Sequence, residues 1–191
     1  MASSPDPVLQ AMATRRSLAK VGPGAPTDDE LRELLAAVTP VADHKALRPW
    51  RLLTLRGDDR VRLGEALDAA AGTERGPGER NGKPFRADLL IAIVASPKAH
   101  PSVPEWEQHA TAAGAAHLLE LALWRAGWGV MWRTGLLVNA PEVRTLHGLR
   151  SDELLMGWLY VGSVDDELRA RIAESPRKPL DTAPFLAALP G

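Results

Sequence analysis

A helix that begins after residue 27 is the clearest element in the pattern of apolar and polar residues. Thr27 can cap its N-terminus, and Glu30, three residues later, completes a capping box. Pro40 ends the helix, because proline has no backbone N–H to donate. Between these limits, four apolar residues recur at helical spacing and form a face that we expect to be buried: Leu31, Leu34, Leu35 and Val38.

Strands are expected at four short apolar runs, residues 50–56, 88–95, 130–133 and 154–161. The run at 88–95 is continuous and contains β-branched residues, which is typical of a central strand buried on both faces. Further helices are expected at residues 8–13, 58–71, 105–126 and 141–146.

The helix at 105–126 is the longest, and alanine and leucine occur all around it. We therefore expect it to be the most buried helix of the domain. Residues 72–83 form a polar, glycine-rich loop, and the chain from residue 163 onward forms a polar, proline-bearing tail. The tail ends in an apolar stretch at 185–189.

Helices and strands are interleaved, yet no glycine-rich fingerprint follows the first strand. This argues against a dinucleotide-binding βαβ half. The pattern favours an α+β fold, in which a central mixed, mainly antiparallel sheet is flanked by helices. A length of 191 residues predicts one domain, residues 1–191.

Composition and charge exclude several classes of protein. The net charge of −1 lacks the basic excess of a nucleic-acid-binding domain. The absence of cysteine excludes disulfides, thiolate catalysis and iron–sulfur clusters. The first ten residues have no signal-peptide pattern, and the apolar stretch at 110–130 is interrupted by polar and charged residues. We therefore expect a cytoplasmic protein with no membrane span.

Arg15, Arg16 and Ser17 form the first candidate site, at the boundary between a helix and a loop. Two guanidinium groups and a hydroxyl can hold a phosphate through charge-assisted hydrogen bonds. The same arginines can instead neutralise the helix C-terminus in solvent, where cations are favoured. Composition alone favours this second role.

Two further segments combine cations with aromatic residues. The stretch 43–50 holds His44 before a strand, and it can line a ligand site or serve as an ordinary polar connection. The stretch 129–135 carries Trp132, Arg133 and Thr134 between glycines, which permit close approach of a ligand to the backbone. An arginine that directly follows an apolar strand is costly to bury without a partner, which favours a ligand contact over a surface turn.

Familiar hydrolase and nucleotide motifs do not occur. The sequence has no HExxH zinc motif, no GxSxG nucleophile elbow and no phosphate-binding P-loop. The stretch 104–108 carries two carboxylates, and their favourable position at a helix N-terminus explains them sufficiently.

Six ordered motifs together resemble the nitroreductase family of flavoproteins, and most closely its small, single-domain NAD(P)H nitroreductases. They lie at residues 15–17, 43–51, 84–87, 103–108, 132–135 and 157–162. The resemblance implies a dimeric nitroreductase-like domain that binds FMN and takes electrons from NADH or NADPH. It implies flavin contacts from seven residues: Arg15, Arg16, Ser17, His44, Trp132, Arg133 and Thr134.

The implied activity is reduction of small acceptors, such as nitroaromatics or quinones, by a ping-pong mechanism. No side chain is expected to be catalytic in its own right, because the flavin carries the chemistry. The sequence departs from the subgroup at Pro40, where a basic flavin ligand is common, and at Ala42, where proline is usual.

Two alternatives stay open from the residues: a flavin store, carrier or sensor without turnover, and an interaction module for an anionic partner. Members of the nitroreductase family are homodimers with two flavins at the subunit interface. We therefore expect the tail, about 164–191, to wrap the partner subunit through its part from Arg177 to Leu189. No metal, nucleic-acid or membrane partner is expected.

Overall fold

The computed structural model describes residues 6–174, 178 and 180–189. Its helices are α1 (Pro7–Thr14), α2 (Asp28–Val38), α3 (Asp58–Ala71), α4 (Glu105–Arg125), α5 (Pro141–Leu146) and α6 (Asp166–Glu174). Its strands are β1 (Trp50–Leu55), β2 (Leu89–Ala95), β3 (Gly129–Arg133) and β4 (Leu154–Gly162). Short 3-10 turns lie at η1 (His44–Ala46), η2 (Lys83–Arg86) and η3 (Ala183–Phe185).

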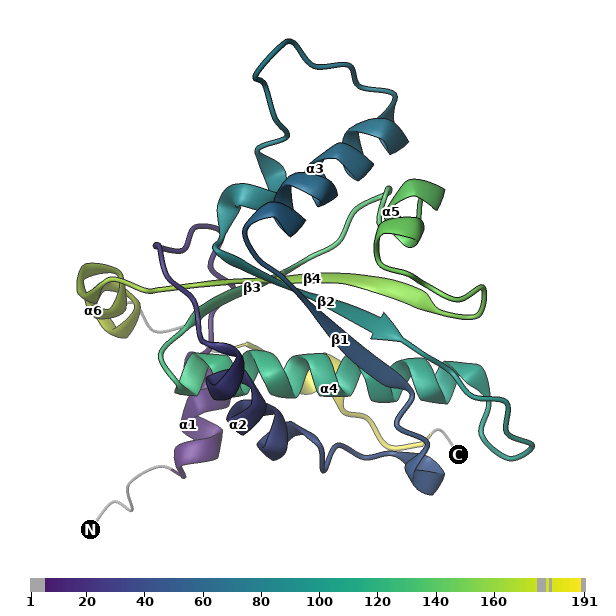
Figure 1. The fold of residues 1–191 in the computed structure, drawn as a ribbon. Helices are drawn as coiled ribbons and strands as arrows, with labels where there is room; N and C mark the ends of the chain where they lie inside the picture. The colour runs from purple at the N-terminus through teal and green to yellow at the C-terminus, as the bar shows by residue number, and fades with distance from the viewer. Residues whose placement is uncertain (1–5, 175–177, 179, 190–191) are drawn as a thin grey trace.

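The four strands form one sheet in the order β1-β2-β4-β3, and every neighbouring pair is antiparallel. A single parallel bridge joins Ser17 to Val130 on β3, so the chain after α1 extends the sheet past its edge strand. The α+β fold with a mainly antiparallel sheet is therefore confirmed. The sheet is covered by α2 and α4 on one face and by α3 and α5 on the other (Figure 1).

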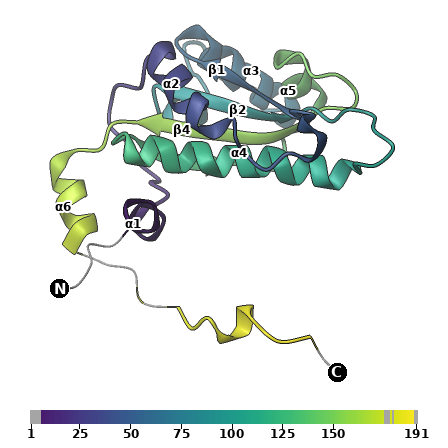
Figure 2. The same ribbon diagram turned by 90° about the horizontal axis from the view of Figure 1, so that it is seen from below.

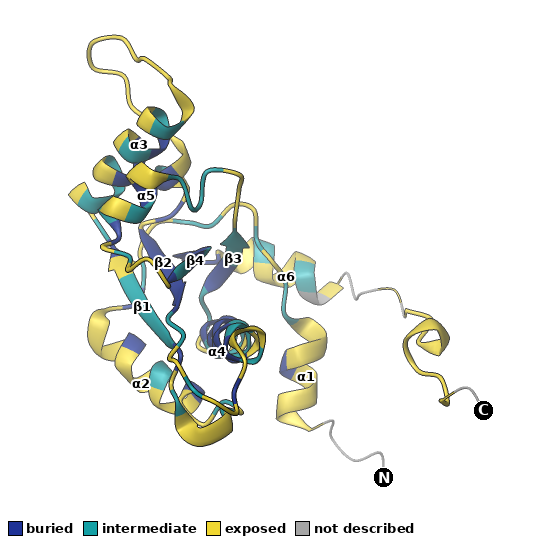
Figure 3. Ribbon diagram, turned by 90° about the vertical axis from the view of Figure 1, so that its right-hand side faces the viewer, coloured by how far each residue is buried: buried dark blue, intermediate teal, exposed yellow. Residues whose placement is uncertain are grey.

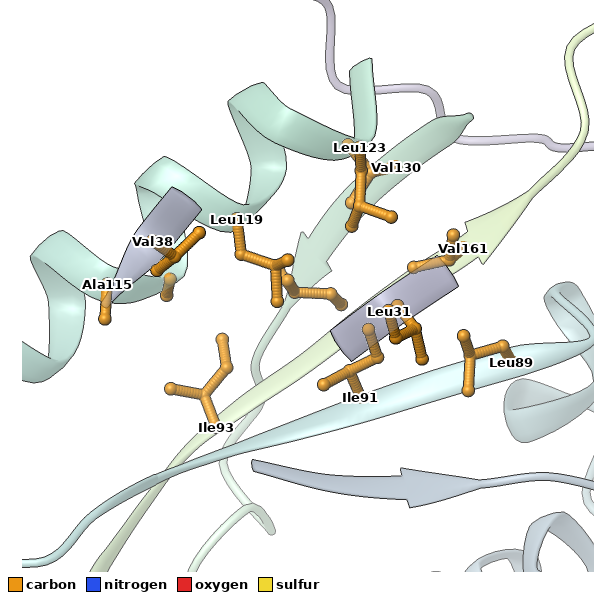
Figure 4. Close-up of a cluster of buried hydrophobic side chains, with 12 residues drawn as sticks. Leu31, Val38, Leu89, Ile91, Ile93, Ala115, Leu119, Leu123, Val130 and Val161 are labelled. Atoms are coloured by element: carbon orange, nitrogen blue, oxygen red, sulfur yellow. The ribbon is translucent and has the colours of Figure 1, made fainter. Parts of the chain in front are cut away.

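Strand β2 builds both cores, because its side chains alternate between the two faces and all seven residues are buried. Leu89, Ile91 and Ile93 meet Leu119 and Leu123 of α4 in the first core (Figure 4). In the second core, the alternate residues of β2 meet residues of α3, α5 and β4: Leu90, Ala92, Val94, Leu63, Val143 and Leu155.

The predicted helices and strands are present with small shifts at their ends. Helix α2 has the predicted capping box, since the Thr27 side chain accepts from the Glu30 N–H and the Glu30 carboxylate accepts from the Thr27 N–H. Helix α4 has the most buried residues of any described helix, as expected. It is nevertheless open on one side, where Trp106 and Leu118 are exposed.

The tail contains α6, which the sequence pattern did not predict. Helix α1 lies beside α4 on the side away from the sheet (Figure 2). The predicted arm starts at Arg177, which lies outside the described residues. Its described apolar side chains are all exposed, as Figure 3 shows for the tail: Leu180, Phe185, Leu186 and Leu189. Within the described part of the chain, no helix is long and apolar enough to cross a membrane.

Candidate functional site

The segment after α1 runs along the edge of the sheet beside β3. Besides the Ser17–Val130 bridge, the N–H of Leu18 donates to the Val130 carbonyl at 3.0 Å. Gly129 permits this approach, because a Cβ atom there would lie 2.8 Å from the Val164 side chain and 3.1 Å from that of Leu18. The fold therefore places two of the predicted segments, residues 15–17 and 132–134, at the same edge.

The two arginines of the first segment do different things. The Nη1 of Arg16 donates to the carbonyls of Ala13, Thr14 and Arg15 at 3.1 to 3.3 Å, at the C-terminus of α1. This is the helix-capping role that the sequence left open. Arg15 turns inward, and its Nη1 donates to the Ser17 hydroxyl at 3.3 Å. It also lies 3.9 Å from a carboxylate oxygen of α4.

Trp132 and Arg133 point to opposite faces of the sheet, as successive residues of a strand do. Trp132 packs on the α4 side, where its indole N–H donates to the Met156 carbonyl at 2.9 Å. The Arg133 Nη2 donates to the Ala19 carbonyl at 2.8 Å and so ties the two segments together. Gly157 on β4 allows the backbone of Arg133 to lie this close to β4. Its φ is +115°, and a Cβ atom there would clash with the Arg133 carbonyl oxygen.

A cavity of about 430 Å³ opens beside Arg133 on the α3 and α5 side of the sheet. Thr134 and Gly135 form part of its wall, and three basic side chains line it: Lys83, Arg86 and Arg133. None of the described residues that line it carries a carboxylate. Among the described residues, the buried Nε of Arg133 has no hydrogen-bond partner. Such an atom next to an open cavity marks a place for an acceptor from a ligand.

Aromatic side chains form the floor of this cavity. The Arg133 guanidinium carbon lies 5.3 Å from the centre of the Tyr160 ring. Burial raises the pKa of the Tyr160 phenol, although the charges of Arg133 and Arg86 act against the rise. A hydrogen bond restrains the Trp158 ring, because its indole N–H donates to His147 Nε2 at 3.0 Å. The cavity thus combines positive charge with flat, rigid walls.

His147 must be neutral to hold Trp158 in this way. Its Nε2 accepts the indole N–H, while its Nδ1 donates to the Val143 carbonyl at 2.8 Å. Burial lowers the pKa of His147, which favours this neutral form.

Lys83, Arg86 and Tyr160 were not among the residues singled out from the sequence. They come from η2 and β4, so only the folded chain brings them beside Arg133. Two signals were present: Arg86 and Tyr160 lie within stretches, 84–87 and 157–162, that take part in the family resemblance.

His44 lies apart from the other predicted residues. Its Nδ1 is 2.9 Å from a carboxylate oxygen of Glu107, in the first turn of α4, whereas Arg15 contacts Glu120 near the far end of that helix. These two glutamates are thirteen positions apart on the helix, or about 20 Å at the usual rise of 1.5 Å per residue. Within one chain, His44 does not join the site at the sheet edge.

Backbone strain marks the loop that holds His44. Three of its residues with side chains have positive φ angles: Lys45 at 63°, Ala46 at 50° and Arg48 at 49°. Asp43 stabilises the loop, because its carboxylate accepts from the backbone N–H groups of Leu47 and Arg48 at 3.1 and 2.7 Å. Strain of this kind is concentrated at functional sites, which makes the loop a second candidate element.

Comparison with known families agrees with this architecture. The model of the nitroreductase family matches residues 12–163, which include every candidate residue named above. The chain belongs to the nitroreductase family.

One relative is the Escherichia coli K12 protein named "Putative NAD(P)H nitroreductase YdjA". It is 33% identical over 159 residues, which cover 81% of this chain and 87% of the relative.

Solved structures share the fold. A nitroreductase-like family protein from Bacillus cereus matches with a TM-score of 0.78 at 20% identity, over 100% of both chains. A structure from Desulfovibrio desulfuricans, described as a putative nitroreductase in complex with FMN, matches with a TM-score of 0.71 at 24% identity. That match covers 98% of this chain and 99% of the other.

Proposed function

We propose that this protein is an FMN-dependent oxidoreductase that uses NADH or NADPH to reduce small acceptors, such as nitroaromatics or quinones. The observation that carries the proposal is the cationic, aromatic-walled cavity beside Arg133, at the edge where Arg15 and Ser17 also lie. The name of the Escherichia coli relative and the FMN in the Desulfovibrio structure support it.

The residues present fit both ends of FMN. Arg15 and Ser17 offer a guanidinium and a hydroxyl to a phosphate, which is the pairing that arginine favours. The cavity offers flat walls and positive charge to a planar ring that carries negative charge when reduced. The Nε of Arg133, which has no hydrogen-bond partner among the described residues, provides a donor at the cavity wall.

When bound, FMN supplies the electron-transfer chemistry, in which hydride comes from NAD(P)H and leaves to the acceptor in a ping-pong sequence. The protein residues position and stabilise. Lys83, Arg86 and Arg133 line the cavity with positive charge, which would stabilise the negative charge of a reduced flavin bound there. Trp158 keeps the wall rigid through its hydrogen bond to His147.

A second copy of the chain completes the site in this proposal. His44 and Arg15 of one chain contact glutamates about 20 Å apart along α4, so His44 reaches a flavin held by Arg15 only from a neighbouring subunit. Exposed apolar residues on α1 and α4 give a dimer surface to bury: Val8, Leu9, Met12, Trp106 and Leu118.

The C-terminal arm is proposed to add to the same interface. A chain truncated after Glu174 keeps α6 and loses the exposed apolar residues of the tail. Size-exclusion chromatography with light scattering should show a weaker dimer, and thermal unfolding should show a lower Tm. A truncated dimer as stable as the full chain would exclude this role for the arm.

The position of Pro40 leaves one flavin contact of the subgroup without a basic side chain. This feature favours a second candidate function, a flavin store, carrier or sensor without turnover. The two candidates differ in whether NAD(P)H reduces the bound flavin.

The visible absorption spectrum tests both candidates. The purified protein is mixed with FMN, freed of excess and then given NADPH or NADH without oxygen. Flavin bands that are near-stoichiometric with the protein and bleach rapidly after NADPH or NADH is added support the oxidoreductase. Bands that persist favour the store or sensor. No bands with excess FMN would contradict both functions and favour an interaction module.

A further inference from the structure

Glu120 is a buried carboxylate in a helix that otherwise buries mainly apolar and small residues. Its side chain is only 3% exposed, and it points from α4 toward the segment after α1. A buried charge is costly unless it is paired. Two groups pair with it here: the Nη1 of Arg15 lies 3.9 Å from one carboxylate oxygen, and the Nδ1 of His117 lies 2.9 Å from the other.

The contact with Glu120 restricts the orientation of Arg15. The Nη1 atom that faces Glu120 also donates to the Ser17 hydroxyl at 3.3 Å. A guanidinium carries five N–H donors in a rigid, planar fork, so fixing one edge of the fork also fixes the direction of the rest. Glu120 therefore sets where the positive charge of Arg15 is presented.

The other partner links Glu120 to the second half of the site. The His117 ring packs edge-on against Trp132, with ring centres 5.1 Å apart and an interplanar angle of 63°. Trp132 in turn is anchored to the Met156 carbonyl. One carboxylate thus connects the Arg15 segment with the Trp132 segment across the edge of the sheet.

We propose that Glu120 is a positioning residue that prepares Arg15 to bind the phosphate of FMN. This inference rests on the proposed function. A long arginine side chain loses conformational freedom when it binds a ligand, and a partner that orders it beforehand lowers that cost. Without the charge of Glu120, the orientation of Arg15 is less restricted and the phosphate binds more weakly.

Riboflavin provides the discriminating probe, because it has the ring and ribityl chain of FMN without the phosphate. Dissociation constants for FMN and riboflavin are measured by quenching of flavin fluorescence in the wild-type protein, Glu120→Gln, Arg15→Gln and the double variant. Glu142→Gln on the exposed face of α5 is the matched control. Thermal unfolding of each variant checks that it is folded.

The expected result is that Glu120→Gln weakens FMN binding roughly tenfold, the size of one lost charged contact, and leaves riboflavin binding unchanged. In the Arg15→Gln background, Glu120→Gln should have no further effect on FMN. Equal losses for FMN and riboflavin, no loss, or tighter FMN binding would each overturn the inference. Should Glu120→Gln not fold, Glu120→Asp tests the same idea, since it keeps the charge but withdraws the carboxylate from Arg15, and it should weaken binding of FMN but not of riboflavin. A wild-type protein that binds neither flavin would instead refute the proposed function itself.

Discussion

At the scale of single residues, Arg133 carries the largest share of the proposed cofactor contacts. Its guanidinium donates to the Ala19 carbonyl and lies against the Tyr160 ring at the cavity wall. Its buried Nε has no hydrogen-bond partner among the described residues. We expect Arg133→Ala to weaken FMN binding about tenfold or more, because hydrogen bonds to charged groups contribute ~1.5–3 kcal/mol. Fluorescence titration measures the change.

The control for this variant is Arg125→Ala, which removes an exposed arginine at the end of α4. It should leave FMN binding as it is. Full flavin content and full turnover in Arg133→Ala would contradict a role for Arg133 in the site.

Glu153 is a second residue whose effect can be stated in advance, here on stability. Its side chain is fully buried and accepts hydrogen bonds from the Nε and Nη2 of Arg51, both at 2.8 Å, and from Arg150. The hydrogen bonds from Arg51 are the main reason that the pKa of Glu153 falls to about 2. The carboxylate therefore stabilises the folded state by on the order of 2–3 kcal/mol at neutral pH.

The sign of this effect follows from the lowered pKa. The stabilisation is fully present above the ordinary pKa of 4.5 and is lost as the pH falls from there toward 2. Urea unfolding at pH 7 and pH 3 should show a smaller loss for Glu153→Gln than for the wild-type protein, since the variant starts without the contribution. An unchanged pH dependence would show that other carboxylates dominate acid unfolding.

At the scale of elements, we expect a substitution in the strained loop 43–49 to increase the stability of the protein. Lys45 has a φ of 63°, a region that costs a residue with a Cβ about 1–2 kcal/mol and glycine almost nothing. Lys45→Gly should therefore raise the free energy of unfolding, by about 1 kcal/mol after the greater freedom of glycine in the unfolded chain is counted. Lys98→Gly, at a position without positive φ, should destabilise instead. Chemical denaturation compares the two.

Most elements of the fold could be predicted from the sequence because their signals are local. The capping box of α2 and the continuous apolar run of β2 each specify their element from a few neighbouring residues. Helix α6 was missed because it lies in a polar, proline-bearing tail and none of its described side chains is buried, so no apolar stripe marks it.

The site could be predicted only in part, because some of its residues come together only in the folded chain. Arg15 and Arg133 were singled out from their motifs, whereas Lys83 of η2 and Tyr160 of β4 join them only when distant segments of the chain fold together. Glu120 was missed because a single carboxylate in an alanine- and leucine-rich helix looks like an ordinary exposed residue. Its role depends on a contact with Arg15, more than 100 positions earlier in the chain.

At the scale of the whole molecule, His44 and Arg15 lie near opposite ends of α4, and this separation predicts how subunits share a site. If a site combines Arg133 of one chain with His44 of the partner subunit, mixing two inactive variants restores one intact site. We expect Arg133→Ala and His44→Ala homodimers each to lose flavin. A heterodimer of the two, purified with two different affinity tags, should bind about one FMN per dimer.

The arithmetic of this experiment separates the two arrangements. With shared sites, the heterodimer contains one site without either substitution and one site with both. With sites confined to single chains, each site keeps one substitution and the heterodimer stays as poor in flavin as its parents. Absorbance at the flavin band against protein concentration gives the count.

The separation of His44 from Arg15 along α4 also has a genetic consequence. In such a dimer every chain serves two active sites, so a chain altered at both ends would spoil both sites of any wild-type chain with which it pairs. Coexpressed in equal amounts, the two alleles would leave only about a quarter of the dimers fully active, since subunits assort at random. Such an allele would behave as dominant, whereas an allele that merely fails to fold would be recessive.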